Sequence, residues 1–82
     1  MNYIIRGGIG RYSPDDNFEL EFAFRLKAAR IAKNISRREI AEQLGISEHS
    51  YAAYERGHRE PRIATIKRIV DILEIDGGYL FK

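Results

Sequence analysis

The side chains of this sequence that could do chemistry are cations, hydroxyls and two histidines, with no thiol among them. Cysteine is absent, His49 and His58 lie apart in the chain, and the glycines at positions 7, 8 and 10 complete no phosphate-binding pattern. Because two histidines without a third convergent ligand are usually surface residues, we expect no metal site. We also expect no catalytic residue and no cofactor, so the sequence indicates a binding protein rather than an enzyme.

The cations are distributed unevenly, and their positions carry more information than the net charge of +2. Residues 25–38 hold six Lys or Arg residues and no acid, and residues 56–68 hold five against Glu60 alone. Such runs are often only solvated faces. Here they flank the stretch between them on both sides, which favours contact with phosphates.

The stretch between the two basic runs predicts two short helices joined by a sharp turn. Ser36 and Glu39 match the S-x-x-E capping box, in which side chains accept hydrogen bonds from unpaired N-terminal amides. The expected helices run from Arg37 to Leu44 and from Glu48 to Arg56. Gly45 enters left-handed backbone at low cost, so the second helix can leave at a steep angle. This pattern is a helix-turn-helix.

Each of these helices has an apolar side and a polar side. The apolar sides form an expected inner face: Ile40, Ala41, Leu44, Ile46, Tyr51 and Tyr54. The expected outer face of the second helix holds five residues: Glu48, His49, Ala52, Ala53 and Arg56. A strip one helix wide fits a DNA major groove, so these are the residues that a DNA reader would present to base edges.

From about Phe22 to Leu80, the sequence resembles the phage repressor and Cro-type helix-turn-helix family, also called XRE-like. The shared features are Leu26, Arg30, Ser36, the run IAEQLGIS, the run YERG at residues 54–57, Pro61 and Ile72-Leu73. Their joint spacing is far more specific than any single feature. The resemblance implies an all-α, five-helix, lambda-repressor-like DNA-binding domain with the helix-turn-helix at helices two and three.

The resemblance also implies roles for polar residues around the motif. Arg30 and Glu55 would form a buried structural ion pair, and removing one member of such a pair typically costs about 3 to 5 kcal/mol. Arg37 stands where the family usually has glutamine, and it adds charge beside a helix N-terminus that faces a phosphate. The residues expected at the DNA backbone are Ser36, Arg37, Arg38, Ser47, Ser50, Arg56, His58 and Arg59.

Four residues are expected at the base edges. Glu48 can accept a hydrogen bond from cytosine N4, and His49 can donate one to guanine O6 or N7. Ala52 and Ala53 offer apolar contact only, so one module should discriminate sequences modestly. Dimerisation would compensate by placing two reading helices about 34 Å apart on a pseudo-palindrome.

The chain divides into an N-terminal extension, residues 1–12, and a helix-turn-helix domain, residues 13–82. Within the extension, Tyr3-Ile4-Ile5 resembles a short strand, and the glycines break any helix. Three interpretations stay open: an arm that places its two arginines in a minor groove, a strand paired with residues 79–81 or with another copy, and a frayed terminus.

Two longer helices are expected on either side of the motif. The first begins at Ser13-Pro14, a serine cap followed by proline, and ends near Asn34, which suits left-handed backbone. Its expected inner residues are Phe18, Phe22, Leu26, Ala29, Arg30 and Lys33. The other helix contributes an apolar face to the core: Ile63, Ile66, Ile69, Val70 and Leu73.

The end of the chain combines Gly77-Gly78 with three large apolar residues. The resemblance implies a short last helix around residues 76–81, but the glycines argue against a firm one because each costs about 1 kcal/mol in a helix. Tyr79, Leu80 and Phe81 could cover the core or contact a second copy, and we favour a homodimer contact.

Length and composition bound the possible functions. Eighty-two residues with 44% hydrophobic content make one small domain. No apolar run is nearly as long as a membrane span, and the N-terminus lacks the length and cleavage pattern of a signal peptide. Without cysteines, a soluble cytoplasmic protein is expected. We expect a dimeric transcriptional regulator, a repressor, whose partner is double-stranded DNA. The alternative is a protein-interaction module with a protein partner, such as the antitoxin of a toxin-antitoxin pair.

Overall fold

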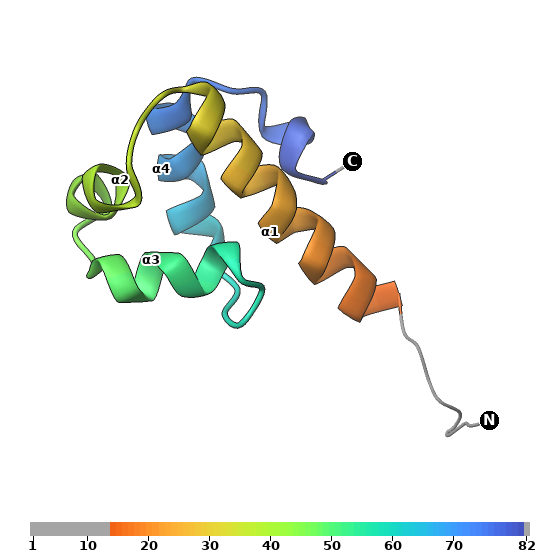
Figure 1. The fold of residues 1–82 in the computed structure, drawn as a ribbon. Coiled ribbons are helices and arrows are strands. Elements are labelled where there is room, and N and C mark those ends of the chain that lie inside the picture. The colour runs from red at the N-terminus through yellow and green to blue at the C-terminus, as the bar shows by residue number, and fades with distance from the viewer. Residues whose placement is uncertain (1–13, 82) are drawn as a thin grey trace.

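The computed structural model describes residues 14–81, with side chains from Leu20 onward. Those residues form helices only (Figure 1): α1 (Pro14–Ala32), α2 (Arg37–Leu44), α3 (Glu48–Glu55), α4 (Ile63–Leu73) and the 3-10 helix η1 (Gly77–Phe81). The all-α class is confirmed. The expected fifth helix is a short 3-10 helix, because Gly77 and Gly78 disfavour an α-helix at its start. The strand considered for residues 3–5 lies outside the described residues.

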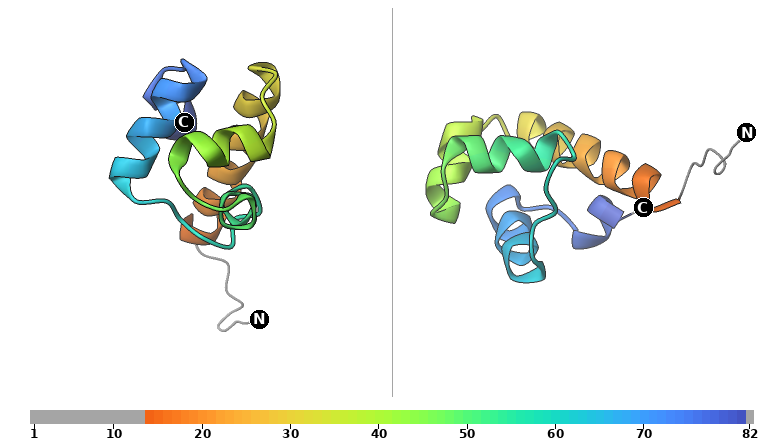
Figure 2. Two further views of the ribbon diagram at one scale, coloured as in Figure 1. Left: turned by 90° about the vertical axis from the view of Figure 1, so that its left-hand side faces the viewer. Right: turned by 90° about the horizontal axis from the view of Figure 1, so that it is seen from below.

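Helix α1 is the longest element and forms one long edge of the molecule (Figures 1 and 2). Phe22, Leu26 and Ala29 are buried on its inner face, as predicted. Ser13, the predicted helix cap, lies outside the described residues. Phe18, predicted on the inner face, lies in the part of α1 whose side chains are not described. None of the helices in the described part of the chain is long and apolar enough to cross a membrane.

The C-terminal end of α1 departs from the prediction at one residue. Lys33 was expected on the inner face, but its side chain is exposed and its ammonium group pairs with the carboxylate of Glu74. The backbone at Lys33 still follows the helical spacing, since its amide donates to the Ala29 carbonyl at 3.0 Å, so the side chain is exposed because it extends past the core to the exposed Glu74. Asn34 has a φ of 62°, the left-handed backbone that was predicted to end this helix.

The caps of the helix-turn-helix are as predicted. The Ser36 hydroxyl accepts from the Glu39 amide at 3.0 Å, and the Glu39 carboxylate accepts from the Ser36 amide at 2.9 Å. Gly45 follows α2 with a φ of 75°, which is the left-handed turn that lets α3 leave at a steep angle. Ser47 caps α3 by accepting from the Ser50 amide at 3.0 Å. The motif is therefore built from local signals.

Helix α4 completes the core with only part of its expected apolar face. Ile69 and Leu73 are buried, and Ile66 and Val70 are partly buried against the core. The prediction for Ile63 was wrong, since its side chain is 72% exposed. Ile63 is the first residue of α4, and no other described element covers it. It instead lines an open groove beside η1.

The three apolar residues at the end of the chain have different environments. Leu80 is fully buried in the core, so the homodimer contact expected of it is wrong and it acts as a lid instead. Tyr79 is partly buried against the same core. Phe81 is 47% exposed, although its ring lies 5.7 Å, centroid to centroid, from the ring of Phe22. Phe81 therefore packs against Phe22 while nearly half of its surface remains exposed to solvent.

Arg68 joins α4 to the end of α2, a contact that the sequence analysis did not predict. Its guanidinium donates to the backbone carbonyl of Leu44 at 3.1 Å and also to that of Gln43. These carbonyls belong to the last turn of α2, where carbonyls lack helical partners and the helix dipole favours a cation. Arg68 is therefore a structural residue, although it lies in the second basic run.

Replacing Arg68 with alanine should lower the free energy of unfolding by about 1.5 to 3 kcal/mol, because a charged donor to two carbonyls is lost. Arg62→Ala is the matched control, since Arg62 is exposed in the same basic run and its side chain makes no described hydrogen bond or ion pair, so its loss should change stability little. Urea denaturation followed by circular dichroism measures both. Equal midpoints for the two variants would contradict the role given to Arg68.

Candidate nucleic-acid interface

Helix α3 has a buried face and an exposed face. Its buried residues are Tyr51, Ala52, Tyr54 and Glu55. The expectation that Ala52 points away from the core is wrong, because its side chain is only 7% exposed. Ala52 lies three residues before the buried Glu55, so it shares that side of the helix. The outer face of α3 therefore consists of Glu48, His49, Ala53 and Arg56.

A buried polar network determines how α3 lies against α1. The guanidinium Nε of Arg30 donates to Glu55 Oε2 at 2.6 Å, and its Nη2 lies 3.4 Å from Glu55 Oε1. Another guanidinium nitrogen, Nη1, donates to the carbonyl of Ile35 at 2.9 Å. One arginine of α1 thus contacts the end of α3 and the loop before α2. The structure brings together the two residues expected to pair.

Tyr51 is the third member of this network. Its hydroxyl donates to Glu55 Oε2 at 2.6 Å, and its side chain is fully buried. Burial, followed by the hydrogen bond to the Glu55 carboxylate, raises the pKa of Tyr51 well above its usual value, so the phenol stays protonated and remains a donor. The hydrogen bond to Glu55 likewise raises the pKa of Arg30. The carboxylate therefore sits between two permanent donors.

Sequence reasoning placed Tyr51 on the inner face and missed its polar role. The available signal was the spacing of Tyr51 and Glu55, four residues apart on one helix, which allows their side chains to meet. The tyrosine hydroxyl supplies a hydrogen bond to a carboxylate whose side chain is only 2% exposed. A buried carboxylate is costly unless it is paired in this way.

The residues expected to contact phosphates at the start of α2 are exposed. Ser36 uses its hydroxyl oxygen as an acceptor in the capping box, and a hydroxyl that accepts can still donate its proton. Arg37 is exposed beside it. Arg38 Nε lies 3.6 Å from Glu42 Oε2, but both side chains are more than two-thirds exposed, at 77% and 68%. An ion pair this exposed is weak and can give way to a phosphate.

The residues expected at the two ends of α3 are also accessible. The Ser47 hydroxyl donates to Ser50 Oγ at 3.0 Å, which leaves the Ser50 proton to point elsewhere. After α3, Arg56, His58 and Arg59 are exposed. The His58 amide donates to the carbonyl of Ala53 at 3.0 Å, so this loop folds back over the end of the helix. Exposed donors therefore lie at both ends of the outer face.

The cations of the two basic runs fall into two groups. Several form contacts inside the molecule, including Arg30 with Glu55, Lys33 with Glu74, and Arg68 with the end of α2. Among residues 20–81, six exposed cations make no described ion pair or hydrogen bond: Lys27, Arg37, Arg56, Arg59, Arg62 and Lys67. The cations that are free for an external contact are therefore individual residues, and neither run is available as a whole.

Glu48 is the one acidic residue of the outer face, and its negative charge would repel a polyanion. It occupies the first turn of α3, where a carboxylate stabilises the positive end of the helix dipole. Its side chain is exposed, so it is also available to an amino group on a base edge. The structure therefore gives Glu48 a local structural role that does not depend on any ligand.

Comparison with known proteins supports a shared ancestry for this arrangement. Residues 26–80 match the family model HTH_3, described as helix-turn-helix. The uncharacterized HTH-type transcriptional regulator YqaE of Bacillus subtilis is 39% identical over 61 residues, which cover 74% of this chain and 53% of YqaE. The cryptic phage CTXphi transcriptional repressor RstR of Vibrio cholerae is 25% identical over 48 residues, covering 58% of this chain and 43% of RstR.

A solved structure has the same fold. The restriction-modification controller protein C.AhdI from Aeromonas hydrophila superposes with a TM-score of 0.76 and 26% sequence identity, over 84% of this chain and 100% of that chain. The aligned region of this chain spans little more than half the length of YqaE, at 53%. The shared part is the helical domain that carries α2 and α3.

Replacing Tyr51 with phenylalanine should lower the free energy of unfolding by about 1.5 to 3 kcal/mol, because Glu55 loses one of its donors while the ring is kept. Tyr54→Phe is the matched control. Tyr54 is also buried on α3, its ring contacts that of Tyr51 with centroids 6.1 Å apart, and its hydroxyl makes no hydrogen bond described here. Thermal unfolding of the two variants compares them directly, and equal losses would contradict the network.

Proposed function

This chain belongs to the helix-turn-helix family, and from that membership we propose that it is a repressor that binds an operator in double-stranded DNA as a homodimer. The observation that carries the proposal is the outer face of α3, which is exposed and lies between donor-rich segments at residues 36–38 and 56–59. A rod of this width enters a major groove, and donors at its ends then meet the phosphates on either side.

Base reading would rest on three residues of the outer face. His49 would donate a hydrogen bond to guanine O6 or N7, and Glu48 would accept one from cytosine N4. Ala53, which is half-buried, can approach a thymine methyl group. The burial of Ala52 leaves fewer reading residues than the sequence indicated. A single copy should therefore discriminate sequences modestly, and two copies are needed for a selective operator.

Backbone contacts would fix the register of α3 on the duplex. The start of α2 offers its N-terminal amides with Ser36, Arg37 and Arg38, an arrangement suited to one phosphate. Ser47 and Ser50 are hydroxyl groups at the start of α3, close enough to its N-terminus to reach a second phosphate. The loop after α3 adds Arg56, His58 and Arg59 as further candidates.

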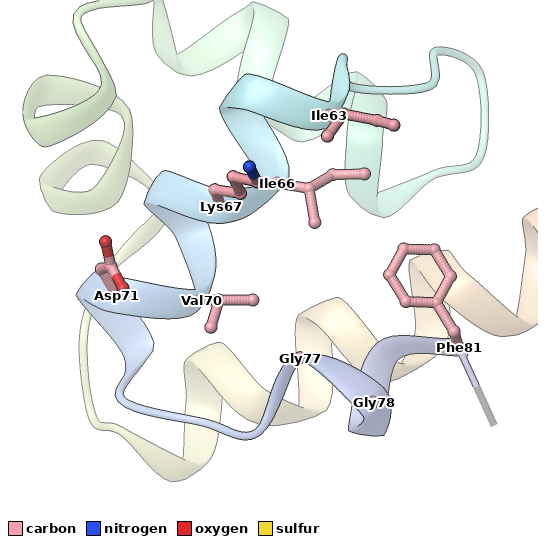
Figure 3. A pocket seen from close by; sticks show the side chains of 8 residues that line it. All are labelled: Ile63, Ile66, Lys67, Val70, Asp71, Gly77, Gly78 and Phe81. Carbon is pink, nitrogen blue, oxygen red and sulfur yellow. The ribbon is translucent and has the colours of Figure 1, made fainter.

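The homodimer would form along the groove between α4 and η1 (Figure 3). Ile63, Ile66 and Val70 extend from α4 toward this groove, and Phe81 borders it from η1. Ile63 and Phe81 are the most exposed apolar residues there, at 72% and 47%. Of the three residues first expected at a dimer contact, Phe81 is therefore the one retained, with Tyr79 as a partly buried neighbour.

Binding to DNA should show both selectivity and a strong dependence on salt. Fluorescence anisotropy with genomic fragments, at low and moderate salt, should give a log affinity that falls linearly with log salt, because phosphate contacts release counterions. A chain that binds all fragments equally, or that retains no DNA while capturing a protein in fixed stoichiometry, would contradict the proposal and favour the protein-interaction alternative.

Replacing Arg37 with alanine should weaken binding to all sequences about equally and reduce the salt slope by about 1, because one phosphate contact is lost. Lys27→Ala is the matched control, since it removes an exposed cation from α1. The same anisotropy titration serves both variants. A loss of affinity that is as large for Lys27→Ala would mean that only the total charge matters.

Replacing His49 with alanine should change which base is preferred at one position of each half-site, with about 1 to 3 kcal/mol of discrimination lost there. Selection from a randomised duplex library before and after the substitution measures this directly. If the preferred sequence is unchanged while affinity falls on every duplex, His49 contacts the backbone and the outer face has been assigned wrongly.

A further inference from the structure

The groove between α4 and η1 has one cation and one anion on its border. Of the eight residues that line it, only Lys67 and Asp71 are charged, and the others are apolar residues or glycines. Both charged side chains are exposed. In Figure 3, Ile66 and Val70 extend toward Phe81, whereas Lys67 and Asp71 do not. The two charges therefore form a polar rim beside an apolar floor.

Lys67 and Asp71 lie on one side of α4, but they do not pair with each other. They are four residues apart, which separates them by about 6 Å along the helix axis. The structure forms ion pairs at this spacing between Glu21 and Arg25 and between Arg38 and Glu42. Within the described part of the chain, neither Lys67 nor Asp71 has an ion pair or a side-chain hydrogen bond. Each charge is therefore available to an opposite charge on another molecule.

The two signs of charge on this rim identify the molecule that covers the groove. One cation and one anion cancel, so the groove offers no field that would attract a polyanion or a strongly charged protein. A second copy of this chain presents the same two charges. In a twofold dimer, residue i of one copy contacts residue j of the other while j contacts i. A rim that carries both signs is therefore complementary to itself, whereas a rim of one sign would repel its own copy.

We propose that Lys67 of one copy pairs with Asp71 of the other, twice in each homodimer, and that these pairs set the register of the two α4 helices. This inference rests on the homodimer of the proposed function. A twofold axis perpendicular to α4, at the level between the two residues, makes the helices antiparallel and brings each ammonium group beside the carboxylate of the other copy. An axis at the level of either residue brings two like charges together, which is unfavourable.

The floor and the rim of the groove then have different tasks. The apolar side chains supply the area that is buried, because burial of apolar surface drives association. Exposed ion pairs add little affinity by themselves, whereas like charges placed opposite each other are clearly unfavourable. The rim pairs therefore select one register among several that the apolar floor would accept. Variants that create like-charge contacts are the most sensitive test of this role.

Two single charge reversals, K67E and D71K, test the pairing in the full-length chain without DNA. The first leaves two acids on the rim and the second leaves two bases, so each variant should form its homodimer roughly tenfold more weakly than the wild-type chain. An equimolar mixture restores both pairs, because every rim charge then meets its opposite on the other copy. Sedimentation equilibrium measures the association, and native mass spectrometry shows whether the dimers in the mixture are mixed.

The mixture should associate about as tightly as the wild-type chain and should consist mainly of mixed dimers. A pair within one helix is not restored by mixing, so this recovery assigns the pair to two different copies. K27E and E60K are the matched controls, since they change the net charge by the same amounts at exposed residues outside the groove. Each control should dimerise like the wild-type chain, and their mixture should show no preference for mixed dimers.

The result distinguishes this inference from the proposed function. If the wild-type chain dimerises and K67E and D71K dimerise equally well, the rim charges do not set the register, and the inference is overturned while the homodimer stands. A mixture as weak as the separate variants would also overturn it, because Lys67 and Asp71 would not meet. A wild-type chain that stays monomeric at every concentration would overturn the homodimer and the pairing together. DNA binding is measured separately by anisotropy, so its failure would affect only the proposed function.

Discussion

The orientation of α3 depends on a single buried carboxylate and the donors gathered around it. Glu55 accepts from Arg30 and from Tyr51 at 2.6 Å each, and Arg30 also holds the carbonyl of Ile35. A charge in this environment is tolerated only when every partner is in place, because an unpaired buried charge costs several kcal/mol. The network therefore links α1, α3 and the loop before α2 in one arrangement.

The arginines of the domain fall into two groups, those that hold helices together and those that remain at the surface. Arg30 and Arg68 satisfy groups inside the molecule and hold helices together, whereas Arg37, Arg56 and Arg59 remain at the surface. A sum over the basic runs would treat these five residues alike. Their environments show that charge count and charge availability are different quantities, and only the second bears on contact with a polyanion.

Much of the fold could be predicted from the sequence because its signals are local. The Ser36–Glu39 capping box and the left-handed residues Asn34 and Gly45 each act within a few residues. Ile63, Leu80 and Ala52 were misplaced because their burial depends on elements distant in the chain. Arg68 was missed for the same reason, since no helical periodicity reports which carbonyl a long side chain will reach. The residues expected at DNA remain predictions.

The central claim is that the outer face of α3, with the exposed donors at its ends, is the surface that meets DNA. Amide chemical shifts of the full chain, recorded while a duplex selected from random sequence is added, test it most directly. The account predicts that the largest changes occur at residues 36–38, 47–53 and 56–59. Changes concentrated on the exposed side of α1 or on the groove beside η1, with α3 unaffected, would contradict it.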